Sequence, residues 1–302
     1  MIRKSLVFAG SWAVAVSFAA AADLSSDPVK LSAAQIVEKN VAARGGLEAW
    51  RAVQTMTLSG KLGAGGNQRA TLQTPNNGPA GRAKPGEMTV PQRPVEEVQL
   101  PFVMKLERPR KMRFELEFAG QTALQVFDGT NGWKLRPFLG RRVVEPYTAD
   151  EMKTTSKQAD LDGPLVDYAA KGSRVELAGV EQVEGRDNYK IKLTLKSGES
   201  LHVWIDTQTF LETKMEGQPR RLDGTDHPVE VYLRDYRNID GLEIPFVLET
   251  KVLPVGRTAL GFKDPPVPVE RTRIEKVVVN PKLEEAQFAK PDAEVASNAK
   301  RQ

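Results

Sequence analysis

The chain has 302 residues, of which 40% are hydrophobic and 27% are charged, with no cysteine and two histidines. The absence of cysteine excludes a disulfide framework and thiolate metal ligands, and His202 and His227 fit no His-rich ligand spacing. A formal net charge of +4 is small for this length, and no nucleic-acid-binding motif is present, so nucleic acid is not an expected partner.

The first 22 residues have the pattern of a secretory signal peptide. Arg3 and Lys4 precede an apolar run that ends in Ala20-Ala21-Ala22, which fits a small-residue cleavage site. The run is about 17 residues long, near the lower limit for crossing a bilayer, so a retained membrane anchor is the alternative. We expect cleavage after about Ala22 and an exported, periplasmic protein whose net charge falls to +2, because two of the 43 basic residues are removed.

Helices are predicted at the front and in the middle of the chain. Residues 31–43 begin with a capping box formed by Ser32 and Gln35, and they carry an apolar stripe. Residues 47–53 continue as one or two helical turns after Gly45-Gly46. A second capping box, Thr148 with Glu151, opens a mostly polar helix over 148–160, and 164–171 predicts another short helix.

Apolar and polar residues alternate through most of the remaining chain, which is typical of half-buried strands. The alternation is clearest over residues 188–217, which predict three strands joined by two tight turns. There Leu193, Val203 and Met215 lie on apolar faces, whereas Glu212 and Glu216 are expected on a solvated face. Further strands are predicted at 55–62, 98–107, 111–118, 122–128, 133–137, 175–183, 229–238, 242–252 and 272–279.

Residues 63–97 differ from the rest, because they hold five prolines and six glycines with few apolar side chains. Such a stretch buries too little apolar surface to offset its ordering entropy, so we predict a flexible insertion between two strands. It is either a partner-binding loop or a tolerated insertion. Residues 292–302 are expected to form a disordered tail.

The order of these elements predicts an α+β fold with one domain over residues 23–291. Strands and helices do not alternate as a parallel sheet requires. We therefore expect a single large, curved antiparallel sheet of about ten or eleven strands. It would form an unclosed half-barrel whose concave side is covered by helices.

Two motifs resemble the LolA/LolB-type lipoprotein carriers of the lipoprotein-sorting superfamily, whose fold is shared by RseB-like sensors. Residues 127–137, Phe-Asp-Gly-Thr-Asn-Gly-Trp-Lys-Leu-Arg-Pro, are similar to the family's D-G-x-x-x-W-x-x-x-P hairpin, and residues 189–215 resemble its next landmark. The resemblance covers roughly residues 31–290. It implies an unclosed barrel with a helical lid, and an apolar hollow that receives the acyl chains of lipoproteins.

Candidate ligand-binding residues are large apolar side chains predicted to line such a hollow. They are Phe114, Leu116, Trp133, Leu193, Val203 and Phe246. The alternative is that the same residues form a closed core sealed by the front helix. The expected partners are lipid acyl chains or lipoproteins, and a membrane-associated protein is a further candidate partner. The protein is expected to be a monomer.

Catalysis has little support in the sequence. No G-x-S-x-G elbow, phosphate-binding glycine loop or zinc-binding motif is present, and Lys196-Ser197-Gly198 is better explained as a turn. We expect no catalytic residue, metal or cofactor. The alternative function is a periplasmic sensor or interaction module with the same fold and no transported ligand.

Overall fold

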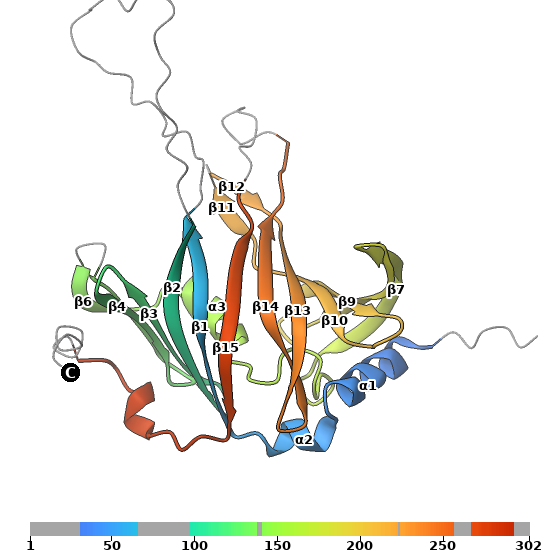
Figure 1. Cartoon of the computed structure of the whole chain (residues 1–302), viewed down its shortest axis with the longest axis horizontal. Helices are drawn as coiled ribbons and strands as arrows, with labels where there is room; N and C mark the ends of the chain where they lie inside the picture. Colours follow the sequence, from blue (N-terminus) through green and yellow to red (C-terminus); the bar gives the residue numbers. More distant parts are fainter. Residues whose placement is uncertain (1–30, 66–96, 138–140, 223, 257–266, 293–302) are drawn as a thin grey trace, which may run out of the picture. The chain divides into compact units, whose positions relative to one another are not determined.

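The structure is a computed structural model that describes residues 31–65, 97–137, 141–222, 224–256 and 267–292 (Figure 1). The predicted signal peptide, nearly all of the predicted insertion and the predicted tail except Asp292 lie outside these residues. Within them, no helix is long and apolar enough to cross a membrane.

One antiparallel sheet of 13 strands makes up most of the described chain, in the order β6-β5-β4-β3-β2-β1-β15-β14-β13-β10-β9-β8-β7. The sheet is unclosed, as expected, because β6 and β7 form its two ends. Its strands are β1 (Thr55–Gly65), β2 (Glu97–Glu107), β3 (Lys111–Phe118), β4 (Gln121–Phe127), β5 (Gly132–Arg136), β6 (Arg141–Pro146), β7 (Arg174–Val183), β8 (Arg186–Thr194), β9 (Ser200–Asp206), β10 (Glu212–Glu216), β13 (Val229–Ile239), β14 (Leu242–Val252) and β15 (Glu270–Val279).

The described chain holds more strands than the sequence predicted. The strand β6 and the two-stranded sheet formed by β11 (Arg220–Leu222) and β12 (Thr225–His227) were not expected. These short strands lack the apolar alternation by which strands are recognised. The ladder between β1 and β2 continues to Gly65 and Glu97, so the ends of the predicted 63–97 insertion belong to paired strands.

The two faces of the sheet follow from the strand pairing, because directly opposed residues share a face. One row runs from Leu58 to Met104 and Phe114, and the same face carries Lys134 of β5. Lys134 donates to Glu151 of the helix α3 (Ala149–Gln158), so α3 lies on this face. We call it the inner face, and the opposite side the outer face.

The sheet curves strongly around α3. At one end of the helix Glu151 pairs with β5, and at the other Lys157 pairs with Glu199, in the turn between β8 and β9. β5 and β9 are nine places apart in the sheet order, which is about 43 Å in a flat sheet with strands about 4.8 Å apart. A ten-residue helix spans only about 15 Å, so the sheet has to bend. Figure 1 shows α3 behind the central strands.

The front helices α1 (Ala33–Ala43) and α2 (Leu47–Ala52) lie where the sequence predicts them. Ser32 and Gln35 form the expected capping box, and Gly45 and Gly46 adopt positive φ angles between the helices. A side chain at Gly45 would collide with the main-chain oxygen of Gly241, so this turn closes directly against the loop between β13 and β14.

The segment that follows α3 corrects one prediction. Residues 164–171 were expected to be helical, but 161–172 form consecutive turns instead. The buried Asp162 carboxylate holds this segment, since it accepts from Arg108 at 2.6 Å and from Lys171 at 2.5 Å. Leu165 and Val166 are fully buried, so the segment contributes to the core without being a helix.

Candidate ligand-binding site

A bulge in β10 determines which of its side chains face inward. Glu212 is paired with Ile205 and Met215 with Val203, and the register shifts between Glu212 and Lys214. Glu212 therefore shares the inner face with Met215. The prediction of a solvated Glu212 was wrong, because strict alternation does not survive an extra residue in a strand.

The buried Glu212 carboxylate joins β10 to the front helices. Its Oε1 accepts from Arg44 Nη1 at 3.3 Å, and its Oε2 from Tyr236 Oη at 3.2 Å. Arg44 also donates to the main-chain oxygen of Asp162, and Asn40 of α1 donates to the main-chain oxygen of Phe210. These contacts seat α1 on the inner face, over the β7–β10 end of the sheet.

Three of the candidate ligand-binding residues are buried on the inner face, Leu193 and Val203 in this covered part and Phe246 on β14. Leu193, Val203 and Phe246 have exposed fractions of 0%, 1% and 3%. Side chains of α1 that face the sheet, such as Ile36 and Val37, are equally buried. In the structure these three candidates are core residues.

Two other candidates, Phe114 and Leu116, belong to a part of the inner face that is only half-buried. They lie on β3, and Phe114 stacks on Phe102 of β2 with ring centroids 5.8 Å apart. We call this part the open apolar surface. Its members are half-buried apolar side chains on the inner-face positions of the central strands: Leu58, Leu62, Met104, Phe114, Leu116, Met215, Val231, Leu233 and Leu248.

The sixth candidate, Trp133, lies on the outer face. It is directly opposite Val126 of β4, whereas Phe114 is opposite Gln125. The hairpin motif that suggested Trp133 therefore directs its indole away from Phe114 and Leu116, and places Lys134 on the inner face instead.

Lys134 and Arg136 anchor the first turn of α3. Glu151 lies 2.6 Å from Lys134 and 2.8 Å from Arg136, and it also caps the helix through the main chain of Thr148. Burial by itself raises the pKa of Glu151, but the hydrogen bonds from Lys134 and Thr148 outweigh it and hold the pKa at about 2.

The last turns of α3 are anchored in the same way at the other end of the sheet. Glu199 accepts from Lys153 at 2.8 Å and from Lys157 at 2.9 Å, and these two bonds lower its pKa to about 2. α3 is thus held across the inner face by ion pairs at both ends, with only Thr155 fully buried. The sequence signal that could have found this role is the Thr148–Glu151 capping box together with the lysines of a polar helix.

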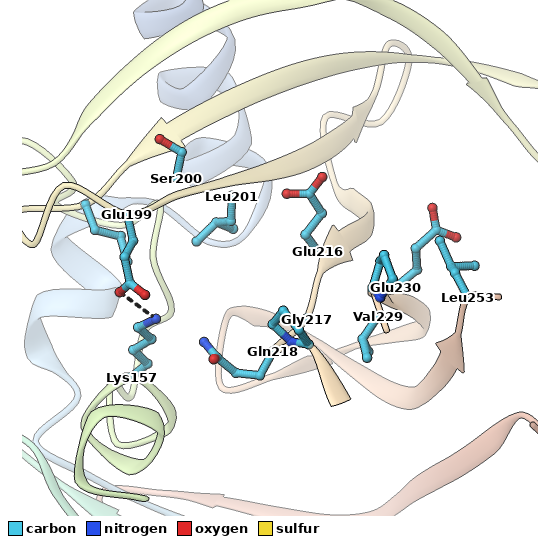
Figure 2. A pocket seen from close by; sticks show the side chains of 13 residues that line it. Lys157, Glu199, Ser200, Leu201, Glu216, Gly217, Gln218, Val229, Glu230 and Leu253 are labelled. Carbon is cyan, nitrogen blue, oxygen red and sulfur yellow. Dashed lines mark ion pairs between the residues drawn. The ribbon is translucent and has the colours of Figure 1, made fainter. Parts of the chain in front are cut away.

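A pocket of about 430 Å³ opens beside this second anchor. One wall is the end of the β8–β9 hairpin and the other is the end of β10 with the start of β13, and Lys157 of α3 completes it (Figure 2). The walls combine apolar side chains such as Leu201 and Val229 with the carboxylates of Glu216 and Glu230.

No metal-binding arrangement is found among the residues that the structure describes. No group of three or more His, Cys, Asp or Glu side chains there is placed to hold a metal ion. His202 Nδ1 lies 2.9 Å from Glu216 Oε1, a pair that holds the ends of β9 and β10 together.

The fold defines a class of protein: proteins built on one large unclosed antiparallel sheet, with helices such as α1 and α3 over its inner face. The chain is similar in structure to a LolA superfamily protein from Nitrosomonas europaea, with 14% identity, 86% of this chain and 99% of that chain covered, and a TM-score of 0.49. It is also similar to a domain from Vibrio parahaemolyticus described as outer membrane lipoprotein-sorting, with 10% identity, 85% and 95% covered, and a TM-score of 0.46.

A third similar structure is a DUF1329 family protein from Desulfovibrio piger, with 12% identity, 84% of this chain and 95% of that chain covered, and a TM-score of 0.49. The LolA superfamily, which the 127–137 hairpin resembles, is thus named among the structures to which the chain is similar. No family model and no curated protein matches the sequence. What the protein binds has to be inferred from its own residues.

Proposed function

We propose that this protein is an exported, periplasmic, non-enzymatic binding protein that holds acyl chains of lipids or lipoproteins against the open apolar surface. The observation that carries this proposal is that surface itself. Apolar side chains on neighbouring strands, among them Met104, Phe114 and Leu116, form one continuous face that α1 does not seal.

Burial of apolar area supplies the binding free energy. Each methylene group removed from water contributes about 0.8 kcal/mol, so an acyl chain needs no specific polar contact to be retained. α3 is held on this face by ion pairs rather than by a buried apolar stripe. A helix held in this way can shift without exposing a core of its own, which suits a surface that has to admit a long chain.

Lipid extraction and native mass spectrometry of gently purified protein test the proposal, together with titration of a fluorescent fatty acid. Met104 and Val103 provide a matched pair of variants, because both are half-buried on β2 and face opposite sides of the sheet. We expect Met104→Glu to weaken uptake of the fatty acid at least about tenfold, because it buries a charge beneath the acyl chain. Val103→Glu should change uptake little.

Absence of any bound lipid, together with no uptake of the fluorescent fatty acid, would contradict the proposal. Capture of a protein partner that is lost on deleting residues 70–94, by a chain that takes up no lipid, would instead support an interaction module or sensor.

A further inference from the structure

The pocket beside α3 lies where two neighbouring strands of the sheet separate. β9 and β10 are paired at Lys214 with Trp204 and at Met215 with Val203, and no later pair joins them among the described residues. β10 itself continues alongside β13, through Glu216 with Glu230 and a main-chain bond from Gly217 to Val229 of 2.8 Å. The pocket occupies the resulting gap (Figure 2).

The direction of the main-chain groups on β9 follows from the hairpin with β8. Leu195 N–H donates to Glu199 O at 2.8 Å, so Glu199 directs its main-chain groups toward β8. Successive residues of an antiparallel strand direct these groups to opposite sides, so Ser200 and His202 direct theirs toward β10 and the gap.

The opposite wall follows the same rule. Because Gly217 donates to β13, Glu216 directs its main-chain groups toward β9. The His202 N–H does not reach the main chain of β10 and donates instead to the Glu216 carboxylate at 2.9 Å. At the end of the gap nearest the last β9–β10 pair, the Glu216 side chain thus accepts the hydrogen bond that a main-chain oxygen of β10 would otherwise accept.

We propose that this gap is a peptide-binding site, in which a short extended segment adds as a strand between the ends of β9 and β10. Strand addition uses main-chain hydrogen bonds for affinity and wall contacts for selectivity. The pocket volume of about 430 Å³ lies in the range of about 300–1,000 Å³ for sites that bind small ligands.

The charge of the walls selects the peptide. Three carboxylates line the pocket, but Glu199 is already paired with Lys153 and Lys157, and Glu230 with Lys214. Glu216, whose partner among the described residues is His202, is therefore the wall carboxylate that favours a segment with a basic side chain. Leu201 and Val229 provide apolar contacts on either side. This site is separate from the open apolar surface and does not depend on acyl-chain binding.

A fluorescent, end-capped heptapeptide that alternates threonine and valine around a central lysine provides the probe, and its binding is measured by anisotropy. The same peptide with central glutamate is the comparison. We expect the lysine peptide to bind about tenfold more tightly, which corresponds to about 1.4 kcal/mol. Equal affinities would overturn the charge selection, and no binding of either peptide would overturn the site.

Ser200 allows a test of the main-chain contact. It is the first residue of β9, a position where proline is tolerated, and its N–H is directed into the gap. We expect Ser200→Pro to weaken binding of the lysine peptide about tenfold, the effect of one lost hydrogen bond, and Ser200→Ala to leave binding within about twofold. Equal binding by the two variants would contradict strand addition.

Two further measurements keep the outcome clear. Circular dichroism shows whether Ser200→Pro is folded. If the variant is unfolded, the test is instead made on the unmodified protein, by measuring amide chemical-shift changes at Ser200 and Glu216 when the peptide is added. Absence of such changes on adding the peptide would overturn the site. Met104→Glu, which is expected to weaken acyl binding, should bind the peptide normally, so failure of one proposal is distinguishable from failure of the other.

Discussion

Arg44 Nη1 lies 3.3 Å from Glu212 Oε1, and the two side chains are only 10% and 9% exposed. The pair links the residue that ends α1 to the first residue of β10 and fixes which part of the inner face is closed. Breaking a buried pair on one side leaves an uncompensated charge, which costs about 3–5 kcal/mol.

We therefore expect Glu212→Leu to lower the free energy of unfolding by about 3 kcal/mol or more, measured by urea denaturation. The double variant Arg44→Met with Glu212→Leu should recover most of this loss, because no buried charge remains unpaired. A double variant no more stable than Glu212→Leu would show that the pair is not the cause.

Acid should release the first turn of α3. The pKa of Glu151 is held at about 2 in the folded protein, whereas an unfolded glutamate has a pKa of about 4.3. The stabilisation is therefore complete above pH values of about 4.3 and is lost as the pH falls toward about 2. We expect amide hydrogen exchange in α3 to rise over this interval before the sheet unfolds.

Glu151→Gln should loosen α3 at neutral pH, because glutamine cannot form the ion pairs with Lys134 and Arg136. The acid dependence of hydrogen exchange that remains in α3 should then come from Glu199 at the other end of the helix, and uptake of the fluorescent fatty acid should become faster. Thr154→Ala, on the same helix, is the control. Unchanged exchange in Glu151→Gln would mean that these ion pairs do not hold the helix.

The two parts of the inner face should respond differently to truncation. Leu193 is fully buried, so Leu193→Ala should cost about 2–5 kcal/mol of stability with little direct effect on ligand affinity. Phe114→Ala, in the open apolar surface, should weaken fatty-acid binding several-fold at a smaller cost in stability. Denaturant titration and fatty-acid titration of both variants measure this contrast, and equal effects of both on binding would contradict it.

Gly132 should tolerate no side chain. A Cβ atom at this position would overlap the ring of Tyr147, so Gly132→Ala should destabilise the protein by about 1–3 kcal/mol. Combining it with Tyr147→Ala should cost less than the sum of the two single changes, because the overlap is gone. Strictly additive losses in a thermal or urea double-mutant cycle would show that no such overlap exists.

Much of this architecture could be predicted from sequence, because it depends on local chemistry. The two capping boxes located the starts of α1 and α3, and the alternation of apolar side chains located the β13–β14 hairpin and placed Leu201, Val203 and Ile205 on one face. The order of these elements was sufficient to infer one large antiparallel sheet.

The tertiary structure decided the rest, because it depends on pairings between distant residues. A single bulge turned Glu212 inward, and the pairing of β4 with β5 placed Trp133 on the outer face. Whether an apolar strand residue is sealed, as Leu193 is, or half-open, as Phe114 is, depends on which helix covers it. Alternation determines only that two residues share a face; what lies over that face is set by contacts far apart in the chain.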